Sequence, residues 1–183
     1  AGGGEAARSF PASAAGAATD EPSDGTREAV LALSRKRYPE AVAQVERALS
    51  KAPHDPAALE VKARTLSAAG DKENAWAVAE ELKACVGDRD MNALFLHARL
   101  SNAAHAYQSE ADSLERLIAL AERHGLSATD YRVYLGQSYA KQGLARPALE
   151  QLEQALKDPN LSAAQRADIT TALEAVRSRA GTL

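Results

Sequence analysis

Histidine and cysteine are the residue types in this chain best suited to metal binding or nucleophilic catalysis, and both are rare. The histidines are His54, His97, His105 and His124, and the one cysteine is Cys85. No HExxH segment occurs, so no two histidines have the spacing of a zinc-protease helix. One cysteine excludes a disulfide within the chain and a zinc site of four cysteines. We therefore predict that the protein is not an enzyme and has no metal site and no cofactor.

The composition favours packed helices. Hydrophobic residues make up 45% of the 183 residues, but aromatic residues only 4%. Alanine, the strongest helix former, supplies much of the apolar fraction, whereas strands favour β-branched and aromatic residues. The net charge of −3 gives no electrostatic basis for binding nucleic acid. No apolar run approaches the roughly 18 residues that a membrane-spanning helix needs.

Apolar residues recur at intervals of three and four from about Thr26 onward, which is typical of amphipathic helices. Pro39 suits the first turn of a helix, and Asp55 and Ser162 are candidate N-caps. Glycine marks four predicted helix ends, at Gly70, Gly87, Gly125 and Gly143. Predicted helices include about 56–69, 72–86, 90–103, 106–123 and 162–179.

The helical pattern repeats along the chain. Ala41 and Ala75 are 34 residues apart and have the same local surroundings. The fullest copy of the pattern comes later, at Leu135, Gly136, Tyr139, Ala148, Leu152 and Ala155. In order and spacing these residues resemble the tetratricopeptide repeat (TPR), a family whose 34-residue unit is a pair of helices. The resemblance covers about residues 22–161.

The resemblance implies an all-α fold, a right-handed superhelical solenoid of about four helix pairs within 25–180. The repeats would span about 22–55, 56–89, 90–127 and 128–161, with a capping helix over 162–179. From Ala75 to Ala148 is 73 residues, five more than two repeats, and we expect the extra length in the second helix or following loop of the third repeat. Cys85 falls at a position that faces the core, so the resemblance implies a packed, unreactive thiol.

In this family the first helices of the pairs line a concave groove that binds a protein or peptide. Carried over position by position, the groove residues are Arg27, Val30, Glu60, Val61, Arg64, Phe95, Arg99, Asn102, Val133, Tyr134, Gln137 and Lys141. Val61, Phe95 and Tyr134 would form an apolar floor for the bound segment.

Arg64 and Arg99 share one position in neighbouring repeats, so we expect them to form a positive stripe along the groove. Such a stripe would favour a short helix or extended peptide that carries an acidic residue. The alternative is that both arginines pair with Glu60 and other nearby acids and form a solvated face.

We therefore predict a non-catalytic protein-interaction scaffold. Residues 1–24, which include Gly2-Gly3-Gly4, are rich in Ala, Gly, Ser and Pro and are expected to form a flexible tether. This layout is similar to that of mature bacterial TPR lipoproteins, which assist pilus and secretin assembly. It would place the protein in the periplasm, anchored to the outer membrane by an N-terminal lipid. The alternatives are a cytoplasmic adaptor or co-chaperone, or the TPR region of a larger periplasmic export protein, and a homo-oligomer is left open.

Overall fold

The computed structural model describes residues 23–181, apart from the side chain of Asp88, and this part of the chain contains helices and turns but no strand. The α-helices in the described residues are α1 (Asp24–Ser34), α2 (Tyr38–Lys51), α3 (Pro56–Ala68), α4 (Lys72–Val86), α5 (Met91–Ala103), α6 (Tyr107–Arg123), α7 (Thr129–Lys141), α8 (Ala145–Ala155) and α9 (Ala163–Ala180). A short 3-10 helix, η1 (Gly87–Arg89), follows α4.

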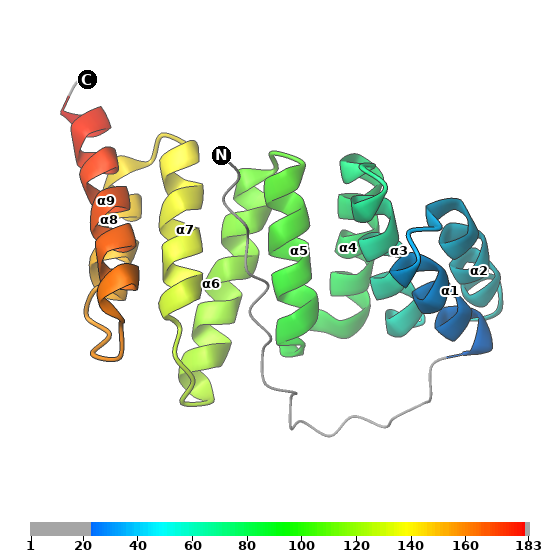
Figure 1. The fold of residues 1–183 in the computed structure, drawn as a ribbon. Coiled ribbons are helices and arrows are strands. Elements are labelled where there is room, and N and C mark those ends of the chain that lie inside the picture. Colours follow the sequence, from blue (N-terminus) through cyan, green and yellow to red (C-terminus); the bar gives the residue numbers. More distant parts are fainter. Residues whose placement is uncertain (1–22, 182–183) are drawn as a thin grey trace.

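The helices form pairs that stack in one row, with α1 and α2 at one end and α8 and α9 at the other (Figure 1). Each helix packs mainly against the helices before and after it in the chain, and α1 also touches α3 as α7 touches α9. The predicted all-α repeat solenoid is therefore confirmed. No helix within 23–181 combines the length and the apolar character that crossing a bilayer requires.

The predicted tether falls almost wholly outside the described residues, and so does its glycine run. Its last two positions, Ser23 and Asp24, form the N-cap and the first residue of α1. The division of the chain into a tether and a solenoid stays a prediction.

Side chains cap the start of five helices within the described residues. The N-cap residues of α1, α3, α4, α5 and α9 are Ser23, Asp55, Asp71, Asp90 and Ser162. Each accepts a hydrogen bond from a backbone N–H of the first helical turn, which would otherwise have no partner. Both predicted caps, Asp55 and Ser162, are confirmed, and Pro39 lies in the first turn of α2 as expected.

The turn inside each of the four pairs contains a residue with a left-handed backbone. These residues are Lys36, Gly70, His105 and Gly143, with φ of 59°, 90°, 61° and 77°. Glycine takes this conformation freely, whereas other L-residues rarely do. Glycine in the sequence therefore predicted the turns at Gly70 and Gly143. The turns at Lys36 and His105 contain no glycine at this position and were not predicted in the same way.

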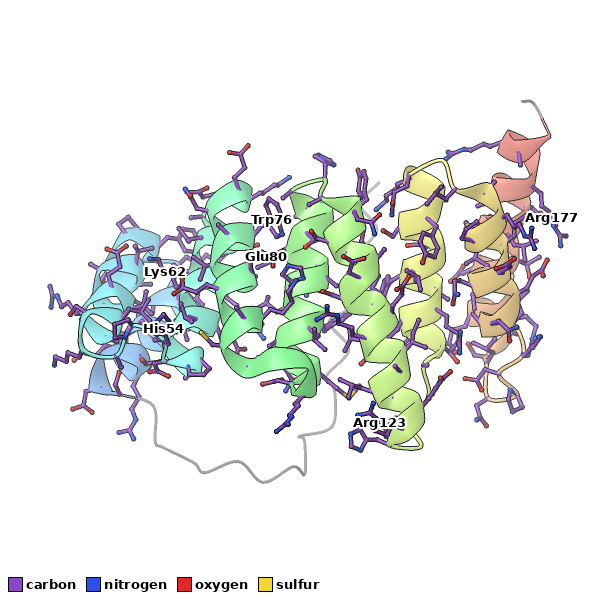
Figure 2. All side chains as sticks on the ribbon, turned by 180° about the vertical axis from the view of Figure 1, so that it is seen from behind. His54, Lys62, Trp76, Glu80, Arg123 and Arg177 are labelled. Atoms are coloured by element: carbon purple, nitrogen blue, oxygen red, sulfur yellow. The ribbon has the colours of Figure 1, made fainter. Side chains whose placement is uncertain are left out.

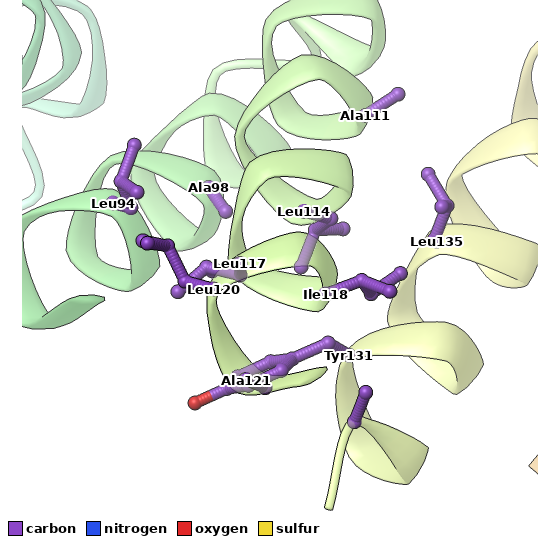
Figure 3. Packing of buried hydrophobic residues seen from close by; sticks show 11 residues of the cluster. Leu94, Ala98, Ala111, Leu114, Leu117, Ile118, Leu120, Ala121, Tyr131 and Leu135 are labelled. Carbon is purple, nitrogen blue, oxygen red and sulfur yellow. The ribbon is translucent and has the colours of Figure 1, made fainter. Parts of the chain in front are cut away.

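Part of the extra length of the third repeat lies in α6. This helix has 17 residues, against 14, 15 and 11 in α2, α4 and α8, which confirms the expected longer second helix. Leu114, Leu117 and Ile118 of α6 are buried between Leu94 of α5 and Leu135 of α7 (Figure 3). The long helix is thus packed on both sides and joins the third pair to the fourth.

Gly136 shows how closely the helices of one pair approach each other. A Cβ atom added there would lie 2.8 Å from Leu152 Cγ and 3.1 Å from the carbonyl oxygen of Ala148, both on α8. The leucine could shift, but the carbonyl belongs to the backbone of α8. The glycine at this position of the repeat pattern is therefore required by the short distance between α7 and α8.

A buried histidine links three helices of the middle pairs. His97 of α5 is fully buried; its Nε2 lies 2.7 Å from Glu80 Oε1 on α4, and its Nδ1 lies 2.7 Å from Ser113 Oγ on α6. Glu80 lies on the side of α4 that faces α5 (Figure 2). A neutral imidazole satisfies both contacts, because one ring nitrogen donates to the carboxylate while the other accepts from the hydroxyl. Lys83 completes the group, with its Nζ 2.9 Å from Glu80 Oε2.

His97 and Glu80 of this cluster have shifted pKa values. Burial lowers the pKa of His97; the hydrogen bond to Glu80 opposes that shift, and the charges of Lys83 and Arg116 add to it. Burial alone would raise the pKa of Glu80, but its hydrogen bonds with Lys83 and His97 outweigh burial and lower it. At neutral pH the cluster therefore holds a neutral imidazole and an ionised carboxylate.

Replacing Gly136 with alanine should lower the free energy of unfolding by about 1–3 kcal/mol, because the added methyl group overpacks the contact with α8. Alanine's higher helix propensity, worth about 1 kcal/mol, acts in the opposite direction. Urea unfolding followed by circular dichroism measures the difference. Gly181→Ala is the matched control, since its Cβ would have no neighbour nearer than 3.6 Å. A stability of Gly136→Ala equal to that of the control would contradict the close contact.

The stability of the protein should fall as the pH drops below about 6.5, the ordinary pKa of histidine, because the unfolded chain then binds a proton that folded His97 resists. The slope contributed by one such group is at most about 1.4 kcal/mol per pH unit. Glu80 acts in the same direction below its own ordinary pKa. The free energy of unfolding of His97→Gln should depend less on pH between 6.5 and 5. If the free energy of unfolding changes with pH in the same way in this variant and in the wild type, His97 is not the source of the pH dependence.

Candidate functional site

A pocket lies between the first helices α5 and α7, with α6 as its floor. Both helices pack against α6, which lies between them in the row, and they make few direct backbone contacts with each other (Figure 1). The pocket has a volume of about 270 Å³. It is lined by Phe95, Ala98, Arg99, Asn102 and Ala103 of α5, Glu110 and Leu114 of α6, and Tyr134, Gln137 and Lys141 of α7.

Aromatic rings form one wall of the pocket. The rings of Phe95 and Tyr134 lie 6.0 Å apart with their planes tilted by 44°. Phe95 also meets Tyr131 in an edge arrangement at 5.9 Å, and Tyr131 is buried in the core. Tyr134, by contrast, is 43% exposed. A rigid apolar surface with a hydroxyl group is therefore held open to solvent, as aromatic residues at interfaces commonly are.

Two cations lie at the pocket. Arg99 and Lys141 are exposed, and neither forms an ion pair with a carboxylate among the described residues. The ammonium group of Lys141 lies 5.3 Å from the centre of the Tyr107 ring, which gives it a cation–π contact. Both groups are thus available to a carboxylate on a bound molecule.

A buried carboxylate lies at the floor of the pocket. Glu110 is only 4% exposed, and its Oε1 accepts a hydrogen bond of 2.7 Å from the side-chain amide of Asn102. Its second oxygen, Oε2, is also buried and has no hydrogen-bond partner in the part of the chain that the structure describes. Glu110 lies in the first turn of α6, where the helix dipole favours a negative charge.

The first turn of α6 is fixed to α7 by hydrogen bonds. The backbone carbonyl of Tyr107 accepts from Ser138 Oγ and from Gln142 Nε2, both at 3.1 Å. Further along α6, the hydroxyl of Tyr139 donates to Glu115. Burial, together with that carboxylate, raises the pKa of Tyr139 to about 12, so its hydroxyl stays a donor at neutral pH. These bonds hold the floor of the pocket in place relative to α7.

The structure brings together half of the predicted groove residues. Six line the pocket: Phe95, Arg99, Asn102, Tyr134, Gln137 and Lys141. Val133 of α7 instead packs, partly buried, against the core formed with α8 and α9.

The predicted groove residues on α1 and α3 lie apart from the pocket. Val30 is exposed on α1, where Arg27 lies 3.8 Å from Asp24. Val61 is buried in the core formed by α1, α2 and α3, so it offers little surface to a partner. Arg64 is paired with Glu60 on its own helix, at 2.7 Å.

The two arginines of the expected stripe therefore have different surroundings. For Arg64 the structure shows the alternative arrangement, an ion pair with Glu60. Arg99 has no carboxylate partner within residues 23–181 and lines the pocket together with Lys141. The positive charge available to a bound segment is centred on α5 and α7, not on α3.

Sequence reasoning missed Glu110 because the family pattern assigns the groove to the first helix of each pair. The sequence nevertheless contains a pattern that indicates a buried position for Glu110. Glu110, Leu114, Leu117 and Ala121 follow the spacing of one helix face, and the other three are buried in the core. A carboxylate at a position that the apolar pattern assigns to the core marks a buried charge, and such charges need a partner.

Ser113, His97 and Glu80 have the order and distances of a serine–histidine–acid relay. Ser113 and His97 are both fully buried, so no substrate can reach the hydroxyl. The described residues hold no cluster of three or more potential metal ligands. The expectation that Cys85 packs in the core was wrong: the residue is exposed, because α4 turns this position away from the core. That its thiol is unreactive stays a prediction.

No protein-family model matches the chain, and no curated protein matches it. Solved structures, by contrast, do match this chain. The TPR-like repeats of a putative kinesin light chain from Podosopora anserina superpose with a TM-score of 0.68 at 19% identity, covering 86% of each chain. MamA from Desulfovibrio magneticus gives a TM-score of 0.63 at 16% identity, covering 86% of this chain and 96% of that one. The Sgt2 TPR domain from Aspergillus fumigatus gives a TM-score of 0.56 at 25% identity, covering 81% of this chain and 95% of that one. The chain thus has the fold of a TPR solenoid.

Proposed function

We propose that this protein is a non-catalytic interaction scaffold that binds a peptide segment of a partner protein in the pocket between α5 and α7. The observation that carries the proposal is the convergence of aromatic and cationic side chains from two neighbouring first helices. Phe95 and Arg99 come from α5, and Tyr134 and Lys141 come from α7. The solved structures with the same fold include TPR proteins, which supports a scaffold of this kind.

The side chains favour an acidic peptide. Arg99 can hold a carboxylate through two parallel N–H donors, and Lys141 adds a second positive charge. Phe95 and Tyr134 offer an apolar surface on which a neighbouring side chain can pack. A volume of about 270 Å³ suits one or two side chains, so the segment would insert side chains into the pocket while its backbone runs across α5 and α7.

The cellular setting is a separate hypothesis. A pilus or secretin assembly lipoprotein and a cytoplasmic adaptor would both use such a pocket. The lipoprotein version depends on the chain around residues 1–22, which lie outside the described residues. The sequence of the gene upstream of Ala1 tests it: a hydrophobic segment that ends in a cysteine supports the lipoprotein, and its absence removes that version.

Arg99→Ala should weaken binding of the partner about 10- to 100-fold, the usual loss for a hydrogen bond to a charged group. The partner is first captured with the purified protein and identified by mass spectrometry. Its dissociation constant is then measured by calorimetry for the wild type and each variant. Binding should also weaken as salt is added, because the charges are exposed.

Arg64→Ala is the matched control, since it removes the same side chain from α3, where Glu60 already neutralises it. It should leave the dissociation constant within about twofold of the wild type, as expected for an exposed pair. An equal loss of affinity in Arg64→Ala and Arg99→Ala would favour a binding stripe formed by both arginines over binding in the pocket alone. Unchanged binding in Arg99→Ala, and also in an Arg99→Ala/Lys141→Ala double variant, would refute the proposed site.

A further inference from the structure

Glu110 presents a buried acceptor that lacks a donor. Its Oε1 is used by Asn102, whereas its Oε2 makes no hydrogen bond and has almost no exposed surface. Only one other buried side-chain polar atom in the described residues, Trp76 Nε1, lacks a partner. A buried carboxylate oxygen without a donor is costly, so such atoms are rare in folded proteins.

Packing does not explain this carboxylate. The same face of α6 continues with Leu114 and Leu117, both fully buried, and an apolar residue at position 110 would extend that face without leaving an unpaired charge. The group is therefore retained at a cost to the stability of the free protein. A role in binding would offset that cost once a partner supplies the missing donor.

The missing donor can reach Glu110 through the pocket. Glu110 is one of the two residues of α6 that line it. The terminal torsion of a glutamate side chain is broad, so the carboxylate can rotate at little cost. Asn102 also lines the pocket and would follow the movement, because its amide is bonded to the same carboxylate.

The surrounding charges indicate what kind of donor fits. The pocket contains two cations, Arg99 and Lys141, and one anion, Glu110, which leaves one net positive charge. A lysine or arginine side chain from a ligand would meet two like charges before it reached the carboxylate. A neutral carboxamide, which has two N–H donors, meets no such repulsion.

We propose that Glu110 is a specificity residue that accepts a hydrogen bond from an asparagine or glutamine side chain of the bound peptide. An acidic residue next to that amide pairs with Arg99 or Lys141. The pocket thus recognises an acid–amide pair. This inference rests on the proposed peptide-binding function and adds a preference that the cations alone do not supply.

Capped dipeptides test the preference directly. The probes are acetyl-Asp-Gln-N-methylamide and its counterparts with Glu, Met or Lys in place of Gln, titrated into ¹⁵N-labelled protein and followed by NMR. The Gln peptide should bind at least tenfold more tightly than the Glu peptide, which is nearly the same size but offers no side-chain donor at neutral pH. The side-chain amide signal of Asn102 should shift with the Gln peptide.

Glu110→Gln should abolish the preference for the Gln peptide, because the second oxygen becomes an amide that donates. The variant can still accept the bond from Asn102 through its own carbonyl, so unfolding measurements should show no loss of stability. Glu153→Gln is the matched control; this glutamate is exposed and pairs with Arg177 on α9. The Glu153→Gln variant should keep the full preference for the Gln peptide.

Three results would overturn the inference: equal binding of the Gln and Glu peptides, tightest binding of the Lys peptide, or an unchanged preference in Glu110→Gln. Failure of every dipeptide to bind would also overturn it. If binding of the captured partner still depends on Arg99 in that case, the proposed function stands without the acid–amide preference. If the dependence on Arg99 is lost as well, the proposed function fails too.

Discussion

The structure depends on how closely successive helices approach each other. At the contact between α7 and α8, Gly136 leaves no room for a methyl group beside Ala148 and Leu152. Fully buried alanines, including Ala41 and Ala75, occur in the earlier pairs. Small side chains at these contacts let each helix pack against the next one in the chain, and repetition of that contact produces a row of first helices whose side chains can act together.

The departure from regular repetition coincides with the candidate site. The long helix α6 separates α5 from α7, and its first turn supplies the buried Glu110. A regular repeat would have been satisfied by an apolar residue at that position. The same helix also carries Ser113, which contacts the buried His97. The middle of the solenoid therefore combines its most polar interior with a pocket, whereas the two ends are held mainly by apolar contacts.

The fold could be predicted from the sequence because its signals are local. The helix caps Asp55 and Ser162 and the glycine turns each act within one or two turns of helix, and the small residues recur at a fixed spacing along the chain. The site could be predicted only in part. Repeat positions located Phe95, Arg99 and Tyr134, but the pairing of Arg64 with Glu60 and the burial of Val61 depend on how neighbouring helices meet. Exposure of Cys85 was missed for the same reason, since a repeat position alone does not determine the direction in which a side chain points.

The most direct test of the account is to map where a bound partner segment touches the protein. Backbone NMR shifts of the labelled protein, recorded with the identified segment added, locate the contact residue by residue. We predict that the largest shifts fall on α5, the first turn of α6 and α7, around Arg99, Glu110 and Tyr134. Shifts concentrated on α1 and α3, or on the outer surfaces of α2, α4 and α8, with the pocket residues unchanged, would contradict it.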